Sequence, residues 1–251
     1  MFGEYKDYVS DHGKYYFKLG DERLGHYVRY QFKNKDIEVL PEDLTMPSSN
    51  EISCLFCNCT KLKNIDALKN WDIKEVKDLG HFFSNCESLE NVDALSKWDT
   101  GNVKFMDEMF WNCKSLKNIN GLRNWNVENL KMMQLMFCDC ESLRSIEPLQ
   151  NWKITNKIKS IDWSFSNCYG IRNAGYIKDW YIPENMSYDT VFSGCSNLRK
   201  RKIRTREDFM EYLTGHNSRQ KIDCMVIDEE NPNQIIDEYE EYDYTSDSEE
   251  N

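Results

Sequence analysis

The large residues of the chain recur with one fixed period, and this repeat limits the possible folds more than any other feature. The recurring unit is the stretch 98–125. Tryptophans are spaced by 27, 27, 27 and 28 residues and cysteines by 27, 27, 27, 28 and 27. They are Trp71, Trp98, Trp125, Trp152 and Trp180, and Cys59, Cys86, Cys113, Cys140, Cys168 and Cys195. Periods in this range indicate stacked copies of one small unit.

The apolar positions around these six cysteines, which we call the period cysteines, repeat with them. Three residues before each stands a phenylalanine, and three residues after each stands Leu or Ile. The phenylalanines are Phe56, Phe83, Phe110, Phe137, Phe165 and Phe192. Apolar residues spaced by three do not fit a flat strand, whose inward residues recur every two. We therefore expect a helical turn at 106–113, an extended piece at 116–119, and phenylalanine rings that stack from coil to coil.

The period covers about residues 49–200, and the segments outside it differ in composition. Residues 1–48 hold short aromatic and β-branched runs around a glycine-bounded loop, which predicts an N-terminal β cap. In residues 201–227, Thr205 with Asp208 resembles a helix capping box, which predicts a C-terminal helical cap. Residues 228–251 carry eleven acidic residues and no Lys or Arg, which predicts a disordered acidic tail.

Charge and targeting features indicate a cytoplasmic protein. The formal net charge is −11, but outside the acidic tail the chain has 32 acidic and 32 basic residues. The N-terminus lacks a basic region followed by an apolar run, and no stretch approaches the roughly 18 apolar residues of a membrane span. The basic run 199–206 is open to three interpretations: a nuclear import signal, a nucleic-acid contact, or a basic end that the acidic tail screens. We favour the third, because a neutral body lacks the positive field of a nucleic-acid binder.

The unit W-D-T-G-N-V-x-x-M-x-x-M-F-x-x-C-x-x-L-x-x-I resembles the BspA-type leucine-rich repeat, in the variant known from mycoplasma surface lipoproteins. This resemblance implies a leucine-rich-repeat-like α/β solenoid of about six coils, with short parallel strands and short helical turns, capped at both ends. It also implies a protein that binds other proteins and has no catalytic residues.

The cysteine and tryptophan columns are predicted to be structural. Small apolar cysteines are among the most buried residues, so packing is favoured over a redox or metal ladder. Cys54 and Cys57 form a lone C-x-x-C, and zinc would need a second pair nearby, so no metal or cofactor is expected. A tryptophan at the same place in every unit fills a corner of the coil more readily than it forms an exposed ligand surface.

Two charged columns are candidate partner-binding surfaces. Four residues after each period cysteine lies the mixed-charge column: Lys63, Glu90, Lys117, Arg144, Arg172 and Arg199. Nine residues before four of them lies the lysine line: Lys77, Lys104, Lys131 and Lys159. Most such charges are only solvated, but we hypothesise that one of the two columns meets an acidic partner. A neighbouring column, five residues after each period cysteine, is mostly asparagine and is predicted to hydrogen-bond along the stack: Asn64, Asn91, Asn118, Ser145, Asn173 and Lys200.

The chain contains no enzyme motif, and its four histidines are scattered, so they do not indicate a catalytic site. Among these His81 stands in a single coil and is predicted to be a surface or structural residue. The sequence therefore predicts a monomeric, non-enzymatic scaffold that binds an unidentified protein partner, with nucleic acid not expected. The alternative is a surface or virion-associated, adhesin-like structural protein. A hydrolase with an unrecognised site is a third possibility.

Overall fold

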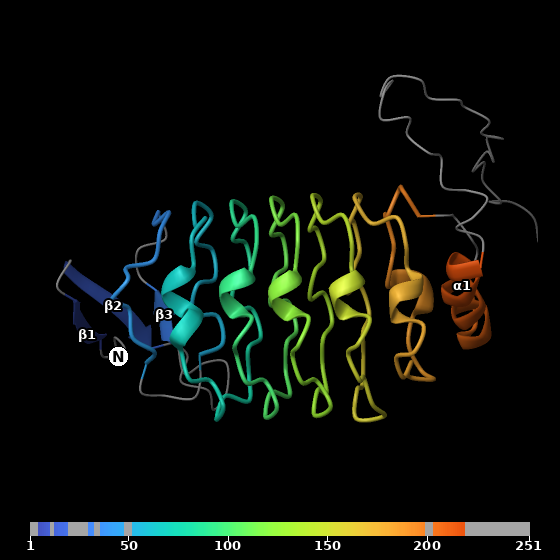
Figure 1. Cartoon of the computed structure of the whole chain (residues 1–251), viewed down its shortest axis with the longest axis horizontal. Coiled ribbons are helices and arrows are strands. Elements are labelled where there is room, and N and C mark those ends of the chain that lie inside the picture. The colour runs from blue at the N-terminus through green and yellow to red at the C-terminus, as the bar shows by residue number, and fades with distance from the viewer. Residues whose placement is uncertain are drawn as a thin grey trace, which may run out of the picture. The chain divides into compact units, whose positions relative to one another are not determined.

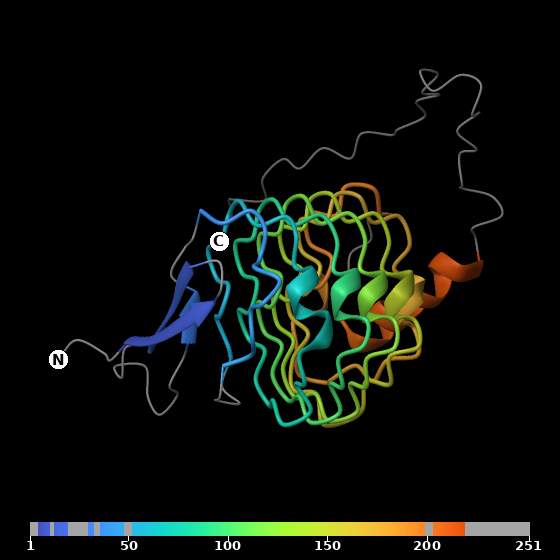
Figure 2. The ribbon, with the colours of Figure 1, turned by 60° about the vertical axis from the view of Figure 1, so that its left-hand side comes forward.

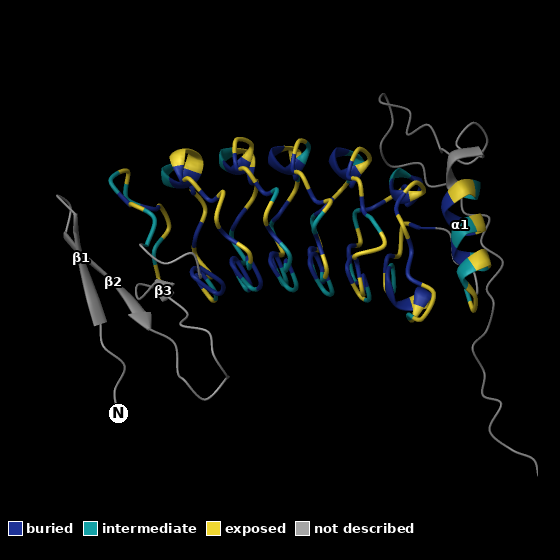
Figure 3. Cartoon of the chain, turned by 90° about the horizontal axis from the view of Figure 1, so that it is seen from below, coloured by how far each residue is buried: buried dark blue, intermediate teal, exposed yellow. Residues whose placement is uncertain are grey.

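The computed structural model describes residues 5–10, 13–19, 30–32, 36–47, 52–198 and 203–218. Over residues 52–198 the backbone forms coils that lie side by side along the molecule (Figure 1). Buried residues line the inside of the coils, and most exposed residues lie on the turns outside (Figure 3). The predicted acidic tail, 228–251, lies outside the described residues. Within the described part of the chain, no helix is long and apolar enough to cross a membrane.

Each coil contains a series of tight turns just before its period cysteine, and these turns join it to the next coil. In the coil of Cys86, the N–H of Phe82 donates to the carbonyl of Leu79 at 3.2 Å, within the coil. The next N–H, of Phe83, donates to the carbonyl of Met109 in the following coil at 2.9 Å. This alternation recurs in the following coils. Successive backbone N–H groups therefore alternate. One donates within its own coil and closes a turn, and the next donates to a carbonyl of the neighbouring coil.

The expected leucine-rich-repeat-like solenoid of short parallel strands and helical turns is wrong. In the segment 106–113, Glu108 and Asn112 have φ values of 53° and 58°, which a right-handed helix does not allow. Parallel pairing between coils is reduced to isolated bridges, such as that between Phe105 and Met132. Apolar residues spaced by three are compatible with consecutive turns as well as with a helix, and the turns are what forms.

The strands of the described residues lie before the coils. They are β1 (Tyr5–Ser10), β2 (Gly13–Leu19) and β3 (Tyr30–Phe32), which form an antiparallel sheet in the order β1-β2-β3. Segment 36–47 then joins the coils, because the N–H of Leu40 donates to the carbonyl of Asn64 at 3.1 Å. Whether the strands act as a cap stays a prediction.

The helical part of each coil is a short 3-10 helix that follows the period cysteine rather than preceding it. These helices lie in a row on one side of the stack (Figure 2). They are η2 (Asp66–Asn70), η3 (Asp93–Leu95), η4 (Asn120–Leu122), η5 (Glu147–Leu149) and η6 (Gly175–Ile177). A further 3-10 helix, η7 (Tyr188–Thr190), is not part of this row, because it belongs to the turns that precede Cys195. The predicted extended piece, 116–119, precedes η4 and forms no strand.

Aromatic columns fill the inside of the coils. The rings of Phe83 and Phe110 stack at 5.7 Å between centroids, and those of Phe110 and Phe137 at 5.5 Å, which confirms the predicted phenylalanine column. The rings of Trp98 and Trp125 stack at 6.2 Å. All of these side chains are buried. Since each ring needs the equivalent ring of the next coil to cover it, one coil alone could not bury its core.

The stack ends against the helix α1 (Arg206–Ser218). Its Phe209 is fully buried and lies 6.4 Å from the ring of Phe192, the last phenylalanine of the column. The N–H of Asp208 donates to Oγ1 of Thr205 at 3.1 Å, and the N–H of Thr205 donates to Asp208 Oδ2 at 3.0 Å. The capping box expected from the sequence is therefore confirmed.

Candidate functional site

The period cysteines are part of the core. The thiol of Cys113 donates to the carbonyl of Phe83, 30 residues earlier, at 3.3 Å, and Cys140 does the same to Phe110 at 3.2 Å. Burial opposes the charged thiolate, so it raises the pKa of Cys113 and raises that of Cys195 to about 12. These thiols therefore have a structural role and are poor nucleophiles. Within the described ranges, no group of three His, Cys, Asp or Glu residues is arranged to hold a metal ion.

The tryptophan column also belongs to the core, as predicted. Trp98, Trp125 and Trp152 are at most 4% exposed. Each indole N–H donates to a leucine carbonyl of the preceding coil, as Trp125 does to Leu95 at 3.1 Å. This hydrogen bond satisfies the polar atom of the buried tryptophan. The rings are also stacked and almost completely buried, so they offer no face to a ligand.

The mixed-charge column is partly neutralised inside the protein. Lys117 Nζ lies 2.9 Å from Glu90 Oε2 in the preceding coil, and Lys63 Nζ lies 3.0 Å from Glu38 Oε2. Arg144 and Arg172 are exposed and make no ion pair with another described residue. Arg199 lies outside the described residues. The five described positions of this column thus do not form one basic surface.

The predicted asparagine ladder, five residues after each period cysteine, is wrong in its direction. Asn64 Oδ1 accepts the N–H of Asp66 at 2.8 Å, and Asn173 Oδ1 accepts the N–H of Gly175 at 2.8 Å. These side chains bind the backbone two residues ahead, at the start of the 3-10 helices, and do not bond from coil to coil. They are structural through these local side-chain-to-backbone hydrogen bonds.

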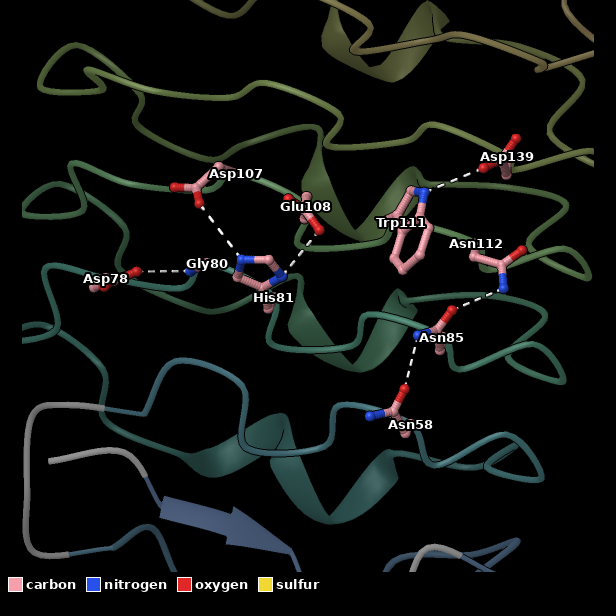
Figure 4. Close-up of polar contacts among 10 residues, drawn as sticks. All are labelled: Asn58, Asp78, Gly80, His81, Asn85, Asp107, Glu108, Trp111, Asn112 and Asp139. Carbon is pink, nitrogen blue, oxygen red and sulfur yellow. Dashed lines mark hydrogen bonds and ion pairs between the residues drawn. The ribbon is translucent and has the colours of Figure 1, made fainter. Parts of the chain in front are cut away.

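A side-chain ladder does run along the stack, but at the position just before the period cysteine. Asn85 Nδ2 donates to Asn58 Oδ1 at 2.7 Å, and Asn112 Nδ2 donates to Asn85 Oδ1 at 2.8 Å (Figure 4). Sequence reasoning missed this ladder. The available signal was the recurrence at this position of Asn, Asp and Gly, which are the residues that accept a left-handed backbone. The φ of Asn85 is 61°.

The lysine line is fixed by direct backbone bonds between coils. The N–H of Lys104 donates to the carbonyl of Lys77 at 2.8 Å, and the N–H of Lys131 donates to the carbonyl of Lys104 at 2.7 Å. Lys159 continues the series by donating to Lys131 at 2.8 Å. Lys104 is half-buried and the other three are exposed, and none of the four forms an ion pair with another described residue. Successive coils thus carry four ammonium groups that have no ion-pair partner in the described part of the chain.

Acidic side chains lie on the same surface as the lysine line, but they are bound within the protein. We call this surface the turn face: the outward side chains from nine residues before to one residue before each period cysteine. His81 Nδ1 lies 3.1 Å from Glu108 Oε2, and His81 Nε2 lies 3.8 Å from Asp107 Oδ2 (Figure 4). Each imidazole nitrogen of His81 therefore faces a carboxylate, and the surface or structural role expected of His81 stays a prediction.

Two further carboxylates of the turn face are held in the same way. Asp139 accepts from the indole of Trp111 at 3.1 Å and from Nδ2 of Asn167 at 2.8 Å. Asp162 accepts the backbone N–H of Ser187 at 3.0 Å. Internal donors thus occupy these acidic groups, whereas the lysines of the same face have no internal acidic partner among the described residues.

Comparison with known proteins gives one family. The model of a family described as "Mycoplasma protein of unknown function, DUF285" matches residues 50–180 and 93–205. Together these matches cover the coils and more than half of the chain. The expected BspA-type leucine-rich-repeat membership is therefore wrong. No curated protein and no solved structure matches the chain.

Proposed function

We propose that this chain, which belongs to the DUF285 family of mycoplasma proteins of unknown function, is a non-enzymatic binding protein that recognises an acidic segment of a partner protein through the lysine line. The family carries no established activity, so the proposal rests on the surface of the molecule.

The observation that carries the proposal is the row of uncompensated lysines. The phenylalanine rings of the same coils are 5.7 and 5.5 Å apart, so the lysines start from backbone positions separated by a similar distance. Like charges at this spacing repel one another, and the repulsion is relieved when carboxylates of a ligand lie along the row. Since the backbone positions are fixed by hydrogen bonds, binding needs little rearrangement of the protein.

The mixed-charge column supports this choice by contrast. Glu38 and Glu90 already neutralise Lys63 and Lys117, and only Arg144 and Arg172 remain uncompensated among its described members. An extended acidic segment would meet lysines that are already paired with Glu38 and Glu90 over the first coils there. It would meet only positive charges along the lysine line.

Matched charge reversals test the proposal. Lys104→Glu with Lys131→Glu changes the net charge as much as Arg144→Glu with Arg172→Glu, on a different column. The probe is fluorescently labelled poly-L-glutamate, and its affinity is measured by anisotropy at low and at physiological salt. We expect the lysine pair to weaken binding at least about tenfold, which is about 1.4 kcal/mol. The arginine pair should change it less than about threefold, because screening limits its effect at a distance.

Equal losses from the two variants would show that only net charge matters, and the proposed site would be wrong. No binding by the unaltered protein at low salt would also contradict the proposal. Circular dichroism of both variants checks that the fold is retained.

A further inference from the structure

The turn face contains two columns with the same unusual backbone and different kinds of side chain. One lies just before the period cysteines and the other four residues earlier, and the non-glycine residues of both have φ values between 53° and 63°. The first column consists of Asn58, Asn85, Asn112, Asp139, Asn167 and Gly194. The second consists of Cys54, His81, Glu108, Leu135 and Trp163.

Leu135 and Trp163 are the least suited to this backbone. A left-handed conformation brings Cβ close to the carbonyl oxygen, and Asn, Asp and Gly tolerate it best. The first column is made of these three residue types, whereas Leu135 has φ 56° and Trp163 has φ 59°. The side chain of Trp163 is also 44% exposed, so burial does not compensate fully for the strain. Strained residues of this kind are concentrated at functional sites.

Leu135 and Trp163 lie next to each other and beside the lysine line. They occupy the same position in successive coils, and the N–H of Leu135 donates to the carbonyl of Asp162 at 3.0 Å. Lys131 and Lys159 precede them by four residues in the same two coils. Between Lys131 and Leu135, Met132 is half-buried. An apolar pair therefore adjoins two uncompensated positive charges.

We propose that Leu135 and Trp163 anchor one aromatic or large aliphatic side chain of the acidic segment that the lysine line binds. This inference rests on the proposed function and adds to it the chemistry of the partner: carboxylates flanking a single apolar residue. Tryptophan is among the side chains that most often carry the binding energy of protein interfaces. The acidic side chains Asp139 and Asp162 of this face make hydrogen bonds within the protein. Lys131 and Lys159 are exposed and make no ion pair with a described residue, so they are the groups that carboxylates of the segment would pair with.

Three labelled probes of equal length test the anchor. The first peptide is glutamate-rich with one central phenylalanine, the second has alanine in its place, and the third probe is single-stranded oligothymidylate. We expect the phenylalanine peptide to bind the unaltered protein about tenfold more tightly than the alanine peptide, since burying an aromatic ring contributes on this scale. Trp163→Ala should remove this gain, so that the two peptides bind this variant with equal affinity.

Tyr169→Ala is the matched control, because Tyr169 is 42% exposed at a position outside the turn face. It should keep the full difference between the two peptides. Trp163→Asn adds a second measurement that a purely structural role would not produce. Asparagine suits the left-handed backbone, so this variant should lose the phenylalanine gain while its Tm rises by about 2–4 °C.

Each result separates the two proposals. If acidic peptides bind through Lys104 and Lys131 but phenylalanine gives no gain, or the gain survives Trp163→Ala, the anchor is wrong and the lysine line stands. If neither peptide binds, the proposed function itself fails. A fall in Tm for Trp163→Asn would show that tryptophan is retained for packing. Tighter binding of oligothymidylate than of either peptide, lost in Trp163→Ala, would assign the face to nucleic acid and overturn the protein partner.

Discussion

At the scale of single residues, the asparagines before the period cysteines do two things at once. Asn85 adopts a left-handed backbone with φ 61°, and its side chain both donates to Asn58 and accepts from Asn112. The backbone turn aims the side chain along the stack, and the amide offers a donor on one side and an acceptor on the other. Asn112 and its neighbours thereby connect three coils with side-chain hydrogen bonds.

Substitutions of Asn85 separate these two contributions. Asn85→Gly keeps the left-handed backbone and loses the side-chain hydrogen bonds, whereas Asn85→Ala loses both. We expect the alanine variant to have a free energy of unfolding at least about 1 kcal/mol below that of the glycine variant, which is the cost of a left-handed alanine. Urea denaturation measures the free energy of unfolding of both variants. Equal stability of the two variants would show that backbone conformation is not what selects asparagine.

Sequence reasoning identified the asparagine column after the period cysteines and missed the one before them, which is the column that bonds along the stack. Asn64 and Asn85 both belong to recurring columns, and their roles differ because their backbones differ. A left-handed φ points one side chain toward the neighbouring coil, whereas the other reaches the N–H two residues ahead. This information is conformational. The run of Asn, Asp and Gly before the cysteine was the only sequence sign of it.

At the scale of elements, the sequence predicted which residues of a coil face inward but not the course of its backbone. The sequence indicated which residues face inward, and Phe110, Cys113 and Trp125 are all buried as expected. It did not distinguish a helical turn from consecutive tight turns, because both place every third or fourth residue on one side. The left-handed residues Glu108 and Asn112 decide between them, and glutamate gives no sign of such a conformation.

The cysteine column makes the stability of the coils depend on pH. Burial raises the pKa of Cys195 to about 12 and raises that of Cys113, so both remain protonated in the folded chain when exposed thiols ionise. Above the unfolded pKa of about 8.5, only the unfolded state loses these protons, so stability falls as pH rises. We expect each such thiol to lower the free energy of unfolding by up to about 1.4 kcal/mol per pH unit between pH 9 and 10.

Urea denaturation from pH 8 to 10 checks this dependence. Cys113→Ala serves as the control, since it should be less stable at pH 8 and show a shallower decline with pH. A free energy of unfolding that stays constant up to pH 10 would contradict the burial of the thiol column.

At the scale of the whole molecule, the two charged columns differ in a way that spacing alone could partly have revealed. Glu90 and Lys117 are 27 residues apart, so a stack of this period brings them together, as the 2.9 Å ion pair between them shows. The lysine line has no acidic member, but the sequence analysis named both columns as candidates without using this difference. The internal binding of Glu108 and Asp139 on the turn face could not be foreseen, because it depends on the path of the turns.

The most direct test of the lysine line as a binding surface is photo-crosslinking in lysate of the organism that encodes the chain. A photoreactive lysine analogue that keeps the positive charge is placed at position 131, or at position 117 as the control, where Glu90 neutralises the charge. We predict a crosslink to an acidic protein segment from position 131, competed by poly-L-glutamate, and none from position 117. Crosslinking of the same protein from position 117 alone, or no specific crosslink from position 131, would contradict the account.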